Sequence, residues 1–460
     1  MKRSLKITLI SVASTLAAIG GVFGGFWAYT LNYKVTPEQS KIENNTGLVQ
    51  AHGKALYDKN GNPIRLRGVN IGNALVQEDW MTAFQVGEAK DENGEYIMDW
   101  KHFTYEHFAE KQFREAIKNN PNFSEYSVDD IVETYAKSFF NENDFKIVKN
   151  DLNMNAIRLP FYYLDILNED LTVKEQEEAF DYFDWFLENC KENDIYCILD
   201  LHGAPGSQNG YDHSGVIDGI ANLWDNEDYI NATVRIWDTI STYYTNVKPE
   251  LGAYIATYDI LNEPREVSAN STTEKCWGVF DRIYDSIREN NDNHVITMEG
   301  CWDFSALPDP KVYEWENVQY EYHWYNWNNE SIPYDIYYMF NELSNIGRNY
   351  DVPVLIGEFT LFEDKAAWHK QLNLFDQRNY SWTIWNYKTC VAGHWQSSWG
   401  VYTISFDFKG DSNKDDRKCN ITNCTYEKFL KTCKEVETDS SESYAKTGTL
   451  YDVLKEYNRK

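Results

Sequence analysis

Eight apolar runs of strand length recur along the chain, and most are separated by segments with helical spacing. This alternation is typical of βα units around a parallel sheet, and eight such units are the number that closes a barrel. We therefore predict an α/β fold, a (β/α)8 TIM barrel. The predicted strands are Ile64–Asn70, Ala156–Pro160, Tyr196–Leu201, Thr257–Leu261, His294–Glu299, Val318–Tyr322, Val352–Glu358 and Ser381–Trp385.

Helices with one apolar side are predicted at Val173–Lys191 and Glu274–Asn290, with Leu450–Tyr457 as the last covering helix. Two connections are much longer than usual. Residues 73–143 follow the first predicted strand, and the cysteine-containing segment 388–446 follows the eighth. Both leave the C-terminal ends of strands, where barrels of this type carry their active sites. We expect both to be long loops that form walls or lids of a cleft.

The chain begins with a short basic segment followed by an uncharged stretch from Ile7 to Tyr33. A cleaved signal peptide has a shorter apolar run, so the length favours an uncleaved transmembrane anchor over a signal. The basic residues ahead of it favour a cytoplasmic N-terminus. We predict an anchor or signal at residues 1–34, a polar stalk at 35–50 and a catalytic domain at 51–460. That domain would lie on the extracellular face of the membrane, or be secreted after cleavage.

The charge of the chain restricts its partners. A formal net charge of −29 argues against nucleic acid and against docking on anionic lipid, because both need clustered Lys and Arg. A neutral polysaccharide meets no such objection. The 16 Trp, 33 Tyr and 23 Phe are more than packing tends to require, and sugar-binding clefts use such rings as stacking platforms. We expect a glycan partner and a monomeric protein.

The chain has eight cysteines, an even number that suits disulfides in an exported domain. Cys419, Cys424 and Cys433 lie in a polar segment and are the better candidates for bridges, whereas Cys197 lies in a predicted strand and indicates a buried thiol. Their pairing stays open. Since the chain has no C-x-x-C pair, we predict no metal site and no cofactor.

Two predicted strands deliver a glutamate to the same rim of the barrel. Glu263 follows the fourth strand in Asp259-Ile-Leu-Asn262-Glu263-Pro264, and Glu358 ends the seventh in Ile356-Gly357-Glu358. Cleavage of a glycosidic bond needs two carboxyl groups, one to protonate the leaving oxygen and one to attack or to screen the positive charge. We predict that Glu263 and Glu358 are these catalytic groups.

Other polar and aromatic residues stand at the ends of the neighbouring strands. Arg158 is a good donor to a carboxylate and would keep Glu358 ionised and oriented, as the hydroxyl of Tyr325 would. Asn262 can bind a sugar 2-hydroxyl, and the two histidines can bind sugar hydroxyls or tune Glu263. The predicted supporting or substrate-binding residues are Arg158, His202, Asn262, His323, Tyr325 and Trp385.

With Asn262-Glu263-Pro264 on strand four and Glu358 on strand seven, the chain resembles glycoside hydrolase family five from about Gly53 to Trp399. The motif Asp200-Leu-His202-Gly203-Ala-Pro205-Gly206-Ser-Gln208-Asn209-Gly210 is similar to the exo-β-1,3-glucanase branch. The resemblance implies a retaining double displacement on β-glucan, with β-1,3-glucan favoured. It also implies that Glu263 is the acid/base and Glu358 the nucleophile.

Two departures from that branch leave the linkage open. The chain has Gly72-Asn73-Ala74 where the branch tends to have G-G-W, and Phe359 where Trp is common; we expect both differences to lie around the sugar subsites. Alternative activities with the same two glutamates are endo-β-1,4-glucanase, β-mannanase, glycolipid glycosidase and transglycosylase. A non-catalytic carbohydrate-binding barrel is the alternative from another class of protein.

Overall fold

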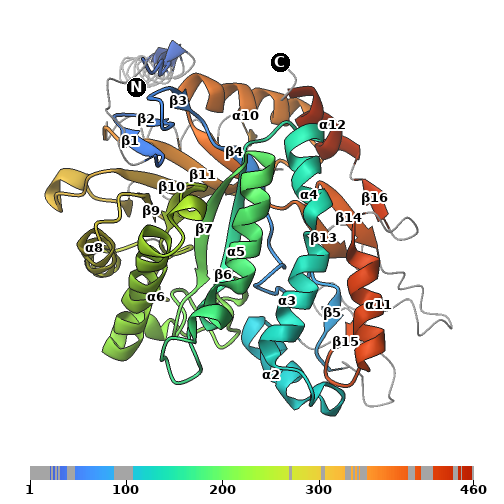
Figure 1. The fold of residues 1–460 in the computed structure, drawn as a ribbon. Coiled ribbons are helices and arrows are strands. Elements are labelled where there is room, and N and C mark those ends of the chain that lie inside the picture. Colours follow the sequence, from blue (N-terminus) through green and yellow to red (C-terminus); the bar gives the residue numbers. More distant parts are fainter. Residues whose placement is uncertain are drawn as a thin grey trace, which may run out of the picture.

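The computed structural model describes residues 47–87, 107–268, 272–301, 306–326, 350–391, 399–405, 418–438, 444–446 and 448–457, with residues 32–38 and scattered positions of 21–29 and 333–341. Eight parallel strands form a closed barrel within these residues (Figure 1). In barrel order they are β4 (Arg67–Asn70), β6 (Ala156–Tyr162), β7 (Tyr196–Gly203), β8 (Ile255–Asp259), β9 (Val295–Glu299), β10 (Val318–Trp324), β11 (Val354–Phe359) and β12 (Ser381–Ile384). The predicted (β/α)8 barrel and its eight strands are confirmed.

Most strand residues are apolar, as expected for strands that are covered on both faces. All seven residues of β6 are buried, as are all six of β11. Helices pack around the outside, as α5 and α6 do over β6 and β7 in Figure 1. The helices are α2 (Glu110–Asn119), α3 (Val128–Phe139), α4 (Glu142–Lys146), α5 (Gln176–Asn193), α6 (Glu227–Asn246), α7 (Pro249–Gly252), α8 (Glu274–Glu289), α10 (Lys365–Arg378), α11 (Tyr426–Val436) and α12 (Gly448–Tyr457). The three predicted covering helices correspond to α5, α8 and α12.

A small antiparallel sheet closes the N-terminal end of the barrel. It consists of β1 (Gln50–His52), β2 (Ala55–Tyr57) and β3 (Pro63–Ile64). Val49 and Leu56 join one apolar cluster with Ala156 and Val295, which stand at the first positions of β6 and β9. The end of the barrel opposite the predicted catalytic rim is therefore sealed by the first part of the domain.

The two long connections contain regular structure, which corrects the prediction of long loops. The first includes β5 (Phe84–Gln85), α2 and α3, and the second includes β13 (Lys388–Val391), β14 (Tyr402–Ser405), β15 (Cys419–Asn420), α11 and β16 (Tyr444–Lys446). β15 pairs with β5, and α3 lies beside α11 in Figure 1. The two segments thus pack on each other as one layer beside the barrel.

Most of the predicted membrane anchor lies outside the described residues, as do residues 39–46 of the predicted stalk. Within the part of the chain that is described, no helix combines the length and the apolar character that crossing a bilayer requires. Within residues 32–38, the Val35 amide donates to the Gln377 carbonyl at 2.9 Å, and the Tyr33 hydroxyl accepts from Lys54 Nζ at 3.0 Å. These residues therefore contact the domain.

All eight cysteines are buried free thiols. This agrees with the prediction for Cys197, but the three cysteines predicted to form bridges form no disulfide with one another. Cys419 and Cys424 share a hydrogen bond, and Cys433 lies on the buried side of α11. The polar sequence around these cysteines conceals an amphipathic helix whose inner face supplies the burial.

Candidate active site

A pocket of about 260 Å³ opens at the C-terminal end of the barrel. Strands β7, β8, β10, β11 and β12 and the residues that directly follow them supply most of its lining. The turn after β7, the segment after β4 and Trp399 supply the rest. Six of the eight predicted site residues line it, and the other two, Arg158 and His323, are fully buried behind it. The lining residues are Glu78, Trp80, His202, Asp212, His213, Asn262, Glu263, Tyr325, Glu358, Trp385 and Trp399.

Glu263 follows β8 with a backbone φ of 42°, in the left-handed region that side chains other than glycine rarely adopt. Its Oε1 lies 2.8 Å from His323 Nδ1, and its Oε2 lies 2.9 Å from His213 Nε2. Burial by itself raises the pKa of a carboxyl group, but the two histidines outweigh it and hold the pKa of Glu263 well below its usual range. Each oxygen of this carboxyl group therefore faces an imidazole.

Glu358 stands near the end of β11 and is held by hydrogen-bond donors on both oxygens. Arg158 Nη1 donates to its Oε1 at 3.0 Å, and the Tyr325 hydroxyl donates to its Oε2 at 2.8 Å. Donors of this kind fix the orientation of a carboxylate. The Glu358 carboxyl group is therefore held in one orientation at the end of β11.

His323, on β10, connects the two glutamates. Its Nδ1 lies 2.8 Å from Glu263 Oε1 and 3.5 Å from Glu358 Oε2, while its Nε2 lies 3.3 Å from Glu321 Oε1. Burial lowers the pKa of an imidazole, but Glu299, Glu358 and the other carboxyl groups around His323 raise its pKa well above the usual value. One ring nitrogen is thus within reach of both predicted catalytic groups.

Arg158 is fully buried on β6 and lies at the centre of a group of carboxyl side chains. Its guanidinium lies 3.1 Å from Asp200, 2.7 Å from Asp259 and 3.4 Å from Glu321, in addition to Glu358. Burial raises the pKa of Asp200 and of Asp259 well above the usual range, despite the adjacent cation. The guanidinium also donates to Asn262 Oδ1 at 2.9 Å, so Arg158 positions two of the predicted site residues.

His202 and Trp385 form a wall of the pocket. Their rings stack with centroids 5.5 Å apart and planes inclined by 7°. Asp200 accepts a hydrogen bond from His202 Nδ1 at 2.7 Å, and among the described residues the buried His202 Nε2 has no hydrogen-bond partner. Burial lowers the pKa of His202 well below the usual value, so the ring is neutral and its Nε2 is an acceptor for a ligand hydroxyl.

Comparison with known proteins shows which family the chain belongs to. The family model described as cellulase, glycosyl hydrolase family 5, matches residues 112–390, more than half of the chain. The chain belongs to glycosyl hydrolase family 5. The resemblance seen in the sequence is therefore confirmed.

Curated relatives are similar to this chain over part of their length. The chain is 28% identical over 283 residues to a β-xylosidase of Phanerodontia chrysosporium, covering 60% of this chain and 52% of that protein. It is 27% identical over 271 residues to a glucan 1,3-β-glucosidase of Schwanniomyces occidentalis, covering 57% of each. The chain spans about half the length of these relatives. The fold of rutinosidase from Aspergillus niger is similar, with a TM-score of 0.53 at 15% identity over 78% of this chain and 96% of that one.

Several residues of this family 5 pocket were not predicted from the sequence. Glu78 and Trp80 come from the segment after β4, and Asp212 and His213 come from the short helix η4 (Asp212–Ser214) after β7. Burial, with Asp212 nearby, raises the pKa of Glu78 to about 8. The only sequence signal for His213 was its place just after the long motif that begins at Asp200.

The two departures from the exo-β-1,3-glucanase branch have different positions. A side chain at Gly72 would collide with Trp385, so the backbone at Gly72 packs directly against this ring of the pocket wall. Phe359, in contrast, is fully buried against Trp368 and Phe375 and does not line the pocket. The expectation that Phe359 lies around the sugar subsites is wrong, because residues alternate between the two faces of a strand and Glu358 takes the inward position.

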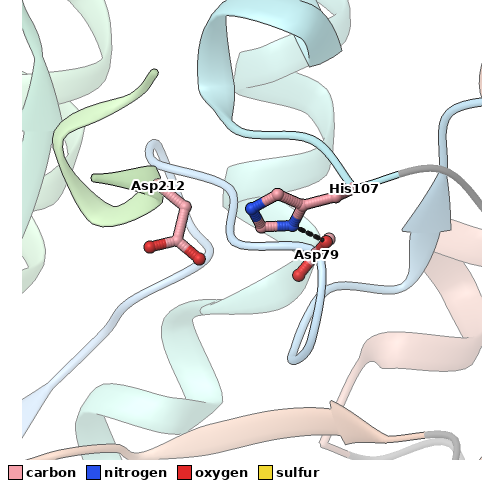
Figure 2. Close-up of side chains that lie close together, drawn as sticks. All are labelled: Asp79, His107 and Asp212. Atoms are coloured by element: carbon pink, nitrogen blue, oxygen red, sulfur yellow. Dashed lines mark hydrogen bonds and ion pairs between the residues drawn. The ribbon is translucent and has the colours of Figure 1, made fainter. Parts of the chain in front are cut away.

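Two groups of side chains among the described residues have the donor types and the spacing of metal ligands. One is Glu263, Glu299 and His323 in the pocket; the other is Asp79, His107 and Asp212 at its edge. Figure 2 shows the His107 ring between the two aspartates, with Nδ1 bonded to Asp79 Oδ2 at 2.5 Å. In both groups the histidine pairs directly with a carboxylate, so we interpret them as ion-paired clusters and assign no metal to either.

Proposed function

We propose that the protein is a retaining glycoside hydrolase of β-glucan, with Glu263 as acid/base and Glu358 as nucleophile. The observation that carries the proposal is the shared contact of both carboxylates with His323 Nδ1, at 2.8 and 3.5 Å. Two oxygens cannot be farther apart than the sum of their distances to a common atom. Glu263 Oε1 and Glu358 Oε2 therefore lie closer together than the roughly 6.5–9.5 Å between the carboxyl groups of inverting enzymes, which leave room for a water molecule. This closeness supports the retaining mechanism.

The contacts of each glutamate suit its proposed part in the reaction. In the first step Glu358 forms a bond to the anomeric carbon while the glycosidic C–O bond breaks and Glu263 gives its proton to the leaving oxygen. In the second step water attacks the glycosyl intermediate, Glu263 accepts the proton of the water, and Glu358 leaves as a carboxylate. Arg158 and Tyr325 hold the carboxyl group of the nucleophile in place, and Asn262, fixed by Arg158, is available for the sugar 2-hydroxyl.

The remaining pocket residues suit a neutral sugar. His202 offers its unpartnered Nε2, and Trp385 offers a flat ring face beside it. Trp80 and Trp399, whose ring centroids lie 5.2 Å apart, line the same pocket. Aromatic faces with a few fixed polar groups are the usual lining of a small-ligand pocket. We place the reacting sugar against Trp385.

Among glucans we favour a β-1,3-linked substrate, supported by the motif that begins at Asp200 and by the relatives named glucan 1,3-β-glucosidase. The relative named β-xylosidase makes aryl β-xyloside a second substrate to examine. Endo-β-1,4-glucanase, β-mannanase, glycolipid glycosidase and transglycosylase activities use the same two carboxyl groups. They differ in the products that they release.

The test is product analysis on β-1,3-glucan, cellulose, mannan, a glycolipid and aryl β-glycosides. We expect glucose as the first product from β-1,3-glucan, released in the β-configuration because a double displacement retains the anomer. Short oligosaccharides from cellulose or mannan would overturn the choice of substrate, and an α-product would overturn the retaining mechanism. Longer products with an added acceptor sugar would indicate transglycosylation.

Variants assign the two roles. Glu358→Gln should abolish hydrolysis of every substrate, while Glu263→Gln should lose about 10²–10⁴-fold on substrates whose leaving group needs a proton. Glu188→Gln, at an exposed position of α5, is the matched control and should behave like the wild type. If the wild type and Glu358→Gln are equally inactive but both bind glucan, the protein is a non-catalytic carbohydrate-binding barrel.

For the whole chain we propose a monomer on the extracellular face of the membrane, held by residues 1–34, or secreted if that segment is cleaved. The support is the uncharged stretch from Ile7 to Tyr33 and the basic residues before it. Fractionation of cells expressing the full chain tests this. Activity in the membrane fraction supports the anchor, activity in the medium supports cleavage, and activity confined to the cytosol contradicts both.

A further inference from the structure

The predicted acid Glu263 is contacted by a histidine that lies outside the barrel strands. His213, in η4, places its Nε2 2.9 Å from Glu263 Oε2 and lines the pocket, with 21% of its side chain exposed. A general acid must carry a proton before it can donate one. With an imidazole against each oxygen, however, Glu263 is favoured in its charged form. The structure therefore poses the question of where the proton resides.

The surroundings of His213 favour a proton on Nδ1 and leave Nε2 able to gain or lose one. Asp212 Oδ1 lies 3.6 Å from Nδ1, and a carboxylate there favours the Nδ1–H form of the ring. Asn209 Nδ2 lies 2.9 Å from Nε2, and an amide N–H supports Nε2 when it carries a lone pair. The Asn209 amide is itself oriented, because its Oδ1 accepts from the Tyr211 amide and its Nδ2 donates to the Glu263 carbonyl.

The other titratable groups around His213 come from several elements. Glu78, after β4, and His202, on β7, act on it across the pocket. Asp212 in turn lies close to the pair of His107 and Asp79, and Figure 2 shows the His107 ring between the two aspartates. Burial lowers the pKa of His213, but Glu263 and Asp212 raise it well above the usual value.

We propose that His213 and Glu263 hold one proton between them and that this pair, rather than Glu263 alone, supplies the proton for the leaving oxygen. The inference rests on the proposed function and extends it to a positioning residue. When sugar excludes water from the pocket, the proton moves from Nε2 to Glu263 Oε2, which turns an ion pair into two neutral groups. Glu263 then gives that proton to the glycosidic oxygen as the C–O bond breaks. In the second step the proton taken from water returns to the pair.

The proposal fixes the direction of a pH effect. Two groups that share one proton can hold it at either site. The apparent pKa of the pair is therefore at least as high as the pKa that either group would have next to a neutral partner. Replacing His213 with a neutral amide should therefore move the alkaline limb of kcat/KM to lower pH. If His213 acted only as a fixed cation that disfavours protonated Glu263, the same replacement would move the limb to higher pH.

The kinetic experiment compares His213→Asn and His213→Gln with the wild type on two aryl β-glucosides. With a poor leaving group, which needs the acid, we expect the alkaline limb to move to lower pH and activity at its alkaline end to fall about tenfold or more. With a dinitrophenyl leaving group, which needs no proton, the first step should be unchanged. His369→Asn, on α10, is the matched control and should keep the wild-type profile. An unchanged or raised limb in both His213 variants overturns the proposal.

A second experiment does not depend on activity. In the full chain with ¹⁵N-labelled histidine, the His213 signals are identified by their loss in His213→Asn and followed with pH. The His213 midpoint should fall in Glu263→Gln, which removes the charge on its partner; an equal midpoint in the two proteins overturns the pair. If the wild type hydrolyses no substrate, the proposed function fails, while this titration still decides whether the two groups share a proton.

Discussion

At the scale of single residues, Arg158 determines the arrangement of the pocket. One guanidinium, with no exposed surface, contacts Asp200, Asp259 and Glu358, and also donates to Asn262. Removing one partner of a buried ion pair costs more than the pair contributes, because the remaining charges stay buried without compensation. Arg158 therefore couples the stability of the barrel to the geometry of the site.

Arg158→Met should lower the free energy of unfolding by about 3–5 kcal/mol, since several buried carboxyl groups lose the guanidinium that contacts them. Chemical denaturation measures this. Arg282→Met is the control, because the ion pair of Arg282 with Glu227 is exposed and should contribute less than about 1 kcal/mol. Equal losses in the two variants would show that the buried cluster has no special role.

Gly357 precedes Glu358 and has no room for a side chain. A Cβ there would lie 1.4 Å from Glu321 Oε1, so Gly357→Ala must displace Glu321 from Arg158 and His323. We expect a loss of about 1–3 kcal/mol in the free energy of unfolding and a lower kcat. Gly278→Ala is the counterpart: its Cβ meets nothing within 4 Å in α8, and it should stabilise the protein by about 0.5–1 kcal/mol. A neutral Gly357→Ala would contradict the close packing.

The site residues that could be predicted from the sequence are those that lie at the ends of barrel strands. Glu358, Arg158 and His323 lie on strands, and the closure of the barrel brings the C-terminal strand ends together whatever the loops do. His213 and Glu78 lie on segments whose path depends on tertiary packing, so no local spacing connected them to Glu263. Phe359 was misplaced because the prediction did not assign its face of β11.

At the scale of elements, the two long connections support each other. Phe84, at β5, stacks on Phe429 of α11 with centroids 5.9 Å apart, and Phe123 contacts Phe429 at 5.7 Å. The eight strands were predictable because most of them carry short apolar runs of strand length. The helix α11 was not, because its apolar positions are interspersed with Lys and Glu that face solvent.

Phe429→Ala should separate these two segments. Its side chain is fully buried, and truncating such a ring costs about 3–5 kcal/mol. Leu430→Ala, one position along the same helix and 42% exposed, should change the free energy of unfolding by less than about 0.5 kcal/mol. Thermal unfolding of the two variants checks this, and similar losses would mean that α11 is not anchored through Phe429.

At the scale of the whole molecule, stability should be greatest at mildly acidic pH. Burial raises the pKa of Glu110 from 4.5 to about 7 and that of Glu78 from 4.5 to about 8. Because these folded-state pKa values exceed the unfolded ones, the folded chain binds more protons between pH 4.5 and about 8. The free energy of unfolding should therefore fall as the pH rises through this window.

Urea denaturation between about pH 5 and 8 measures that slope. Replacing Glu110 with Gln removes one of the groups and should make the slope shallower below about pH 7. A net charge of −29 acts in the same direction, since protonation relieves repulsion. Stability that rises steadily toward pH 8 would show that the buried carboxyl groups are compensated in the folded state.

Tyr33 and Val35 rest beside α10 and Lys54, at the end of the barrel that β1–β3 seal, whereas the pocket opens at the other end. An attachment made at Tyr33 or Val35 therefore lies on the closed side of the barrel. Coupled to a resin bead at this position, the protein would turn the described pocket away from the bead and toward a polymer flowing past. The sealed end of the barrel is thus a natural point of attachment for an immobilised catalyst.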